Sequence, residues 1–171
     1  MMIKEKVLHK VYTSHKDVIS PKRVYRSLIK QAVIMTLQEQ HVNVPCVVNV
    51  LITNGKVIRK YNSEYRGIDK STDVLSFPMQ VFDGAGWENI SALEIDEDTG
   101  LLPLGDIVMS IEHIRRQART YGHSVEHETS YLTIHSTLHL LGFDHIDEQD
   151  KRQMRDLEKF IVKNMGYFND N

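Results

Sequence analysis

The sequence predicts an α+β protein: a small mixed β-sheet packed against several helices, in a single domain that spans residues 1–171. Short β-branched runs stand in the middle of the chain, with amphipathic helical segments before and after them. The sequence has no internal repeat, and its strand and helix segments do not alternate regularly as they do in an α/β protein. Of the 171 residues, 41% are hydrophobic and 26% charged, which is ordinary for a globular domain with its own core.

The first helix is predicted to begin at Ser20-Pro21, since serine is a favourable N-cap and proline fits the first helical position. It continues to about Gln40, because apolar side chains recur at helical spacing up to that point. This stripe consists of Val24, Leu28, Ala32 and Met35, with Ile29, Val33 and Leu37 beside it. Residues 44–52 form a short β-branched run, which predicts a buried strand with Cys46 as a small apolar side chain.

Asn54-Gly55 could form the turn of a β-hairpin, but the residues that follow favour a short helix. Their apolar side chains recur at spacings of three and four: Val57, Ile58, Tyr61 and Tyr65. Two further strands are predicted at residues 73–82 and 104–111. A Gly- and acid-rich loop is expected between them, from Asp83 to Pro103.

Beyond Ser110 the sequence is mostly helical, and three helices are predicted to end at the glycines Gly122, Gly142 and Gly166. Ser124 followed by His127 makes a poor capping box, whereas Asp147 is an acceptable N-cap for the last helix. The apolar positions of that last helix recur at helical spacing: Met154, Leu157, Phe160, Ile161 and Met165.

Charge and composition narrow the functional classes. The net charge of −2 cannot by itself attract nucleic acid or a membrane, so any such affinity must come from local clusters. A single cysteine excludes an intramolecular disulfide and a cysteine-based zinc site. No apolar run reaches the roughly 18 residues of a membrane helix, and the N-terminus lacks the apolar stretch of a signal peptide. We therefore expect a cytoplasmic protein without membrane contact.

The segment IHSTLHLLGFDH, from Ile134 to His145, carries the strongest chemical signal. His135 and His139 are one helical turn apart and face the same side, so both rings can meet one ion. Gly142 can end the helix and turn the chain, which brings His145 back to that ion. Three neutral imidazoles leave one tetrahedral position open, as in catalytic zinc sites. We predict one Zn²⁺ per chain, held by a helix and the turn after it.

The spacing H-x3-H-x5-H with an intervening glycine is that of an extended zinc-protease motif, except that Ser136 replaces the catalytic glutamate. A serine hydroxyl cannot take a proton from water at neutral pH, so peptide hydrolysis by the usual route is disfavoured. Asp144 could accept a proton from a ligand imidazole or cap the turn, and both roles stay open. His123 and His127 are also four apart, but no third ligand follows, so we expect surface or supporting roles for them.

These residues resemble the YbeY-type endoribonucleases, a bacterial family that matures ribosomal RNA. The family motif H-G-x-L-H-L-x-G-Y-D-H is similar to HSTLHLLGFDH, with Ser136 in place of glycine and Phe143 in place of tyrosine. A second block, YNSEYRGIDKSTDVLSFP at 61–78, and a third, LGDIVMS at 104–110, resemble further family segments in the same order and spacing. The resemblance covers about residues 50–146.

The resemblance implies a zinc-dependent, single-strand-selective endoribonuclease that processes the 3′ end of 16S rRNA in small-subunit biogenesis and ribosome quality control. It implies His135, His139 and His145 as the metal ligands, with Arg66 and His139 taking part in catalysis. The partners it implies are single-stranded RNA, in particular rRNA, and the small ribosomal subunit, whereas no DNA is expected.

Arg66 also has a physical case of its own. Cleavage of a phosphodiester builds negative charge on phosphate oxygens, and a planar guanidinium can neutralise it with two hydrogen bonds. The alternative is that Arg66 forms a surface salt bridge to Glu64 or Asp69. Eight Lys and Arg lie in the first thirty residues and none between 71 and 114, a polarity that could give one basic face for a phosphate backbone.

Two other classes of function stay open. A metzincin-like metalloprotease would need a relocated base such as Glu126, and casein digestion that vanishes in a His139→Ala variant would identify it. A non-catalytic ribosome-assembly factor would use zinc only to brace the helix turn. Chelation would then lower the melting temperature without removing any hydrolytic activity.

Overall fold

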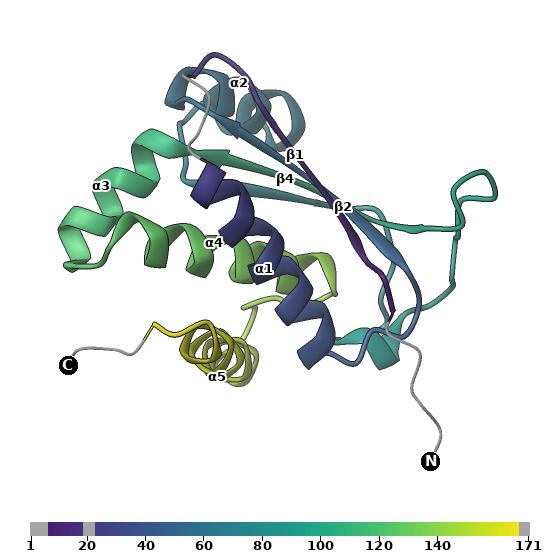
Figure 1. Cartoon of the computed structure of the whole chain (residues 1–171). Coiled ribbons are helices and arrows are strands. Elements are labelled where there is room, and N and C mark those ends of the chain that lie inside the picture. The colour runs from purple at the N-terminus through teal and green to yellow at the C-terminus, as the bar shows by residue number, and fades with distance from the viewer. Residues whose placement is uncertain (1–6, 19–22, 168–171) are drawn as a thin grey trace.

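The computed structural model describes residues 7–18 and 23–167. Within these ranges the chain forms four strands and five α-helices (Figure 1). In chain order they are β1 (Lys10–His15), α1 (Arg23–Glu39), β2 (Cys46–Thr53), α2 (Gly55–Arg66), β3 (Val74–Pro78), the short 3-10 helix η1 (Trp87–Asn89), β4 (Leu102–Ser110), α3 (Ile111–Tyr121), α4 (Val125–Leu140) and α5 (Glu148–Asn164). The predicted α+β class is confirmed.

The strands form one mixed sheet in the order β1-β2-β4-β3. β1, β2 and β4 run parallel, whereas β3 pairs with β4 in the antiparallel sense, from Val74 opposite Met109 to Pro78 opposite Gly105. β3 is therefore an edge strand, and it contacts α4. This arrangement brings the segment that follows α2 close to the helix that carries the histidine motif.

Helix α4 lies at the centre of the helical layer, on one face of the sheet, where it contacts α1, α3, α5 and β3 (Figure 1). Four of its hydroxyl side chains donate hydrogen bonds to carbonyls one turn earlier in the same helix: Thr129 to Val125, Ser130 to Glu126, Thr133 to Thr129 and Thr137 to Thr133. These hydroxyls need no partner from other elements, so α4 can be buried on most sides. On the opposite face of the sheet a small cluster of Ile58, Leu75 and Val108 lies beneath α2.

Strand β1 is absent from the predicted elements. Only Val11 of this strand is buried, and the other residues are exposed or half-buried, so the segment lacks a clear apolar alternation. It becomes a strand because β2 offers an open edge, along which it pairs in parallel from Lys10 opposite Val47 to His15 opposite Ile52. A tertiary contact, not a local pattern, thus determines this element.

The predicted helix after Asn54 is confirmed. The Asn54 side chain accepts a hydrogen bond from the Val57 N–H at 2.9 Å and caps α2, which ends where Gly67 adopts a φ of 69°. Arg66 is the last residue of this helix. The predicted start of the first helix, Ser20-Pro21, lies outside the described residues.

Strand β3 is shorter than the predicted run at 73–82. The ladder to β4 ends at Pro78, and Met79 still donates one backbone hydrogen bond to the Leu104 carbonyl at 2.9 Å. Farther along, Phe82 forms only an isolated bridge, with Ile90. Beyond this point the chain leaves the sheet and enters the loop that begins at residue 83.

The loop predicted from Asp83 to Pro103 contains more structure than expected. Trp87 lies in η1 and is 8% exposed, and its indole N–H donates to Asn43 Oδ1 at 3.0 Å. Leu102 and Pro103 already belong to β4. A buried aromatic ring thus anchors this acidic loop to the core. Among the helices in residues 7–18 and 23–167, none is long and apolar enough for a bilayer span.

Candidate metal centre

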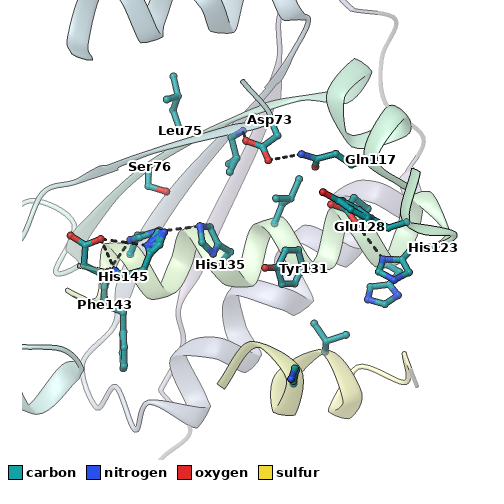
Figure 2. A pocket seen from close by; sticks show the side chains of 18 of the residues that line it. Asp73, Leu75, Ser76, Gln117, His123, Glu128, Tyr131, His135, Phe143 and His145 are labelled. Carbon is teal, nitrogen blue, oxygen red and sulfur yellow. Dashed lines mark hydrogen bonds and ion pairs between the residues drawn. The ribbon is translucent and has the colours of Figure 1, made fainter. Parts of the chain in front are cut away.

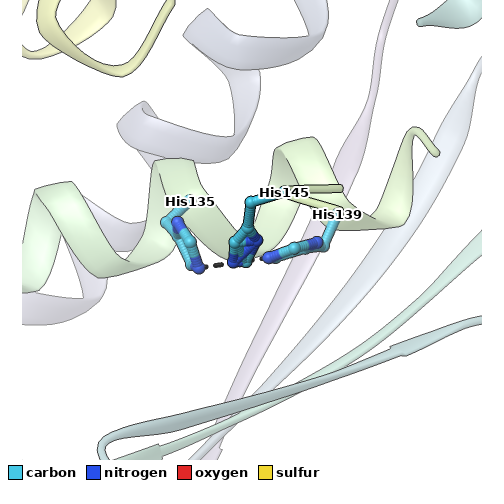
Figure 3. Close-up of side chains that lie close together, drawn as sticks. All are labelled: His135, His139 and His145. Carbon is cyan, nitrogen blue, oxygen red and sulfur yellow. Dashed lines mark hydrogen bonds between the residues drawn. The ribbon is translucent and has the colours of Figure 1, made fainter. Parts of the chain in front are cut away.

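The three histidines of the motif converge at one point (Figure 3). His135 and His139 project from α4, and His145 returns from the segment between α4 and α5. One ring nitrogen from each residue can be chosen so that all three lie within 4.8 Å of one another. The Nε2 atoms of His135 and His139 are 3.1 Å apart. The structure therefore brings together all the predicted ligands, and this cluster could hold a metal ion.

The turn after α4 requires glycine at position 142. Gly142 has a φ of 83°, and a Cβ built there would lie 2.7 Å from the Cβ of Phe82, so both conformation and space exclude a side chain. The Gly142 N–H donates to the His139 carbonyl at 3.1 Å, and the Gly86 N–H donates to the Leu141 carbonyl at 3.0 Å. The start of the acidic loop thus supports the turn that positions the third histidine.

The Nδ1 atoms of the two helical histidines are held by protein groups. His135 Nδ1 lies 2.6 Å from Glu158 Oε1, and His139 Nδ1 donates to the Phe143 carbonyl at 2.8 Å. Tyr131 donates to the other Glu158 oxygen at 3.2 Å. These contacts fix the ring orientations and leave both Nε2 atoms for an ion, as is usual for metal-binding imidazoles.

The electrostatic surroundings of His139 also favour its role as a ligand of a metal cation. Burial and the neighbouring His135 ring lower the pKa of His139, and the hydrogen bond to Phe143 opposes them only in part. At neutral pH, His139 is therefore in the neutral form that binds a metal. Asp144 Oδ1 accepts a hydrogen bond from the His145 backbone N–H at 2.8 Å and lies 3.6 Å from His145 Nδ1. Asp144 therefore caps the turn through this backbone hydrogen bond. Its carboxylate lies near the His145 imidazole but is not hydrogen-bonded to it.

Ser136 does not lie at the metal centre. It is fully buried, and its Oγ has no hydrogen-bond partner among the described residues. It is not one of the residues that line the cleft over the histidines. Position 136 therefore faces the core, where a catalytic glutamate would be of no use to an incoming substrate.

The histidines open into a cleft of about 980 Å³ bordered by β3, α4, the ends of α2 and α3, and one face of α5 (Figure 2). Arg66 and Lys159 are the Lys and Arg residues that line it. Arg66 forms no hydrogen bond or ion pair with the described part of the chain, because Asp69 instead binds Arg59 through two contacts of 2.8 Å. The predicted alternative of a salt bridge from Arg66 to Glu64 or Asp69 does not occur among the described residues, and the guanidinium is available to a ligand.

The pair His123 and His127 lies at the other end of the same cleft and takes no part in the ligand cluster. The two rings stack with centroids 4.2 Å apart, and His123 Nδ1 lies 3.5 Å from Glu128 Oε2. Ser124 caps α4 by accepting from the His127 N–H at 3.0 Å, so this start is better capped than the sequence indicates. Glu126, the base that a protease would need, does not line the cleft.

Glu158 is the functional residue that the sequence interpretation missed. It is 4% exposed although it belongs to a charged helix, whereas Phe160, predicted on the apolar stripe of that helix, is 49% exposed. The available signal was its position, four residues after Met154 and three before Ile161, which places a carboxylate on the buried face of α5.

Replacing Glu158 by glutamine is expected to weaken metal binding by about 10- to 100-fold, because the carboxylate that orients His135 loses its charge while its size is kept. Competition with a chelating dye measures this change. Asp156→Asn makes the same change of charge on the exposed side of α5 and should leave affinity unaltered. Equal affinities of both variants and the wild type would contradict the role of Glu158.

Comparison with known proteins identifies the family. The family model described as Endoribonuclease YbeY matches residues 10–166. A protein of that name from Caldicellulosiruptor saccharolyticus is 49% identical over 120 residues, covering 70% of this chain and 73% of its own. Another, from Caldanaerobacter subterraneus subsp. tengcongensis, is 44% identical over 140 residues, covering 82% and 87%.

A solved structure has the same fold. The solution structure of a protein from Thermotoga maritima superposes with a TM-score of 0.57 at 22% sequence identity, and it covers 90% of this chain and 87% of that one. At this identity the likeness shows the fold alone. The match of the family model over most of the chain, together with relatives above 40% identity, shows that this protein belongs to the YbeY family.

Proposed function

We propose that this protein is a zinc-dependent, single-strand-selective endoribonuclease that matures the 3′ end of small-subunit ribosomal RNA. The observation that carries the proposal is the unpaired guanidinium of Arg66 in the same cleft as the three converging histidines. Membership of the YbeY family supports it independently. Residues 1–171 would form a single endoribonuclease domain.

The residues present fit a zinc ion. Three imidazoles converge, two of them are oriented through Nδ1 by Glu158 and by the Phe143 carbonyl, and His139 is neutral at physiological pH. A bound zinc ion supplies Lewis acidity, which polarises a phosphoryl oxygen or acidifies water. The role of His139 in catalysis is then to hold this ion at the end of α4, next to the cleft.

Arg66 would bind the non-bridging oxygens of the scissile phosphate. Its position at the capped end of α2 fixes the backbone, and the side chain is exposed to the cleft without a competing carboxylate. A planar guanidinium can bind two oxygens at once, so it neutralises charge that grows as the P–O bond breaks.

The proposed selectivity for unpaired RNA is supported by the position of the histidines in a cleft. The His135 and His145 side chains are 23% and 39% exposed, so the ligand cluster is partly open to the cleft. A flexible single strand can enter the cleft and splay its bases, whereas a duplex keeps its bases stacked within a regular helix. The proposal also implies binding to the small ribosomal subunit and action in the cytoplasm, where that RNA is matured.

The test is incubation of zinc-loaded protein with RNA that contains both paired and unpaired segments. We expect cleavage in unpaired segments only, because an unpaired strand can splay its bases within the cleft whereas a duplex keeps them stacked. Analysis of the new 3′ ends separates two routes: a cyclic phosphate indicates attack by the RNA 2′-hydroxyl, and a linear phosphate indicates attack by water. Absence of cleavage, or equal cleavage of duplex RNA, would contradict the proposal.

The two alternative functions have weaker support. A protease would need a base, but Ser136 is in the core and Glu126 lies outside the cleft. Digestion of casein that depends on His139 would support it nonetheless. A zinc-braced assembly factor without activity predicts a lower melting temperature after chelation and no cleavage of RNA by the loaded protein.

A further inference from the structure

The end of the cleft away from the ligand histidines is built from stacked rings (Figure 2). His123 and His127 are parallel within 8° at 4.2 Å, and His127 stacks in turn on Tyr167 at 5.2 Å. Tyr121 lies beside His123, with ring centroids 6.2 Å apart and ring planes tilted by 43°. The Tyr121 ring lines the cleft and is 63% exposed, so one aromatic surface is open to a ligand.

A buried hydrogen-bond acceptor lies at the same end. The Gln117 amide donates through Nε2 to Asp73 Oδ2 at 2.9 Å, which fixes the orientation of the amide. The opposite atom, Gln117 Oε1, is buried and has no partner in the described structure. Burial without a partner is uncommon for such an atom, and a donor on a bound ligand would satisfy it.

The charges at this end disfavour a phosphate. Asp73, Glu128 and the Gln117 carbonyl face it, whereas Arg66 and Lys159 are the only Lys and Arg side chains that line the cleft as described. Hydrogen bonds from Gln117, Val74 and Thr72 lower the pKa of Asp73 although burial, the largest single effect, opposes them. A neutral, flat group with N–H donors suits these surroundings better than an anion does.

We propose that Tyr121, His123 and Gln117 form a nucleobase subsite that holds one unpaired base of the RNA strand whose phosphate reacts at the histidine cluster. The base stacks on the exposed Tyr121 ring beside His123, and its exocyclic amino group donates to Gln117 Oε1. This inference rests on the proposed ribonuclease function. His127, behind this surface, and His135 are eight residues apart on α4, about 12 Å at the α-helical rise, so the base lies a few nucleotides from the reacting phosphate.

Binding to short unpaired oligonucleotides with 2′-O-methyl sugars tests the subsite, with zinc-loaded full-length protein and fluorescence anisotropy. One series replaces each base in turn by an abasic sugar. At one position, wild-type affinity should fall by about 5- to 150-fold, the range expected when one stacked base is lost. Tyr121→Ala should bind the intact oligonucleotide more weakly than the wild type does, by a similar factor. It should bind the oligonucleotide that is abasic at this position as well as the wild type does. Tyr121→Phe should behave as the wild type with both oligonucleotides.

Tyr12 provides a matched control. It is 56% exposed on β1 and does not line the cleft, so Tyr12→Ala should bind as the wild type does. Loss of affinity by Tyr121→Ala that is equal for intact and abasic oligonucleotides would overturn the subsite. Uracil that binds as well as adenine or cytosine at the sensitive position would overturn the part assigned to Gln117. Cleavage of the all-ribose counterparts is measured separately: if it fails, the proposed ribonuclease function fails, whatever the outcome of the binding series.

Discussion

A His139→Ala variant is expected to retain no zinc at neutral pH and to cleave no RNA at a detectable rate. Removal of one of three converging imidazoles leaves two ligands, too few for the three-ligand arrangement of catalytic zinc sites. The ring also makes the hydrogen bond to the Phe143 carbonyl that closes the turn. Metal content by mass spectrometry and cleavage of an unpaired RNA measure the two effects.

The fold of His139→Ala should persist, because His139 lies near the end of α4 and the core contacts of that helix are made by other residues. Far-UV circular dichroism checks this point. His15→Ala, which removes an exposed histidine from β1, should keep both zinc and activity. A His139→Ala protein that is fully loaded and active would refute the assignment of the metal centre.

An Arg66→Ala variant is expected to lose on the order of 10²–10³-fold in kcat, which is typical for the loss of one donor to a developing oxyanion. Its zinc content and melting temperature should stay close to those of the wild type, because Arg66 is exposed and has no partner among the described residues. Arg66→Lys should recover only part of the rate, since an ammonium group lacks the planar fork that binds two oxygens. Single-turnover kinetics measure the effect.

Arg59 offers a matched control on the same helix. It pairs with Asp69 and lies outside the cleft that contains the histidines, so Arg59→Ala should leave kcat unchanged. The exposed salt bridge that it removes is worth at most about 1 kcal/mol. Full activity of Arg66→Ala, or an equal loss in both variants, would show that Arg66 does not act on the scissile phosphate.

The sequence predicted features that depend on short-range order. The spacing of His135 and His139 on one helical face requires only the helix period, and Gly142 marks a position where a side chain is excluded. Helix α2 is predictable for the same reason, because its apolar residues follow the helix period. All of these features lie within a few turns of chain.

Features that arise from contacts distant in sequence were not predictable in the same way. Strand β1 exists because β2 has a free edge, and Glu158 reaches His135 across 23 positions of chain through the packing of α5 on α4. The stacked rings at the far end of the cleft require Tyr167, which follows α5, to meet His127 of α4, forty positions earlier in the chain. Composition and periodicity do not predict such contacts, because the contacts depend on how the helices pack against one another in three dimensions.

The hydrogen bonds from side-chain hydroxyls to backbone carbonyls within α4 have a consequence for metal binding. Because Thr133 and Thr137 satisfy their hydrogen bonds within the helix, the segment that carries His135 and His139 needs no ion to complete its buried hydrogen bonds. In small zinc fingers the ion and the fold appear together, since the ligands have no fixed positions in the apo chain. Here His135 and His139 project from a helix packed in the core, so the spacing of these two ligands is determined by the fold and not by the ion.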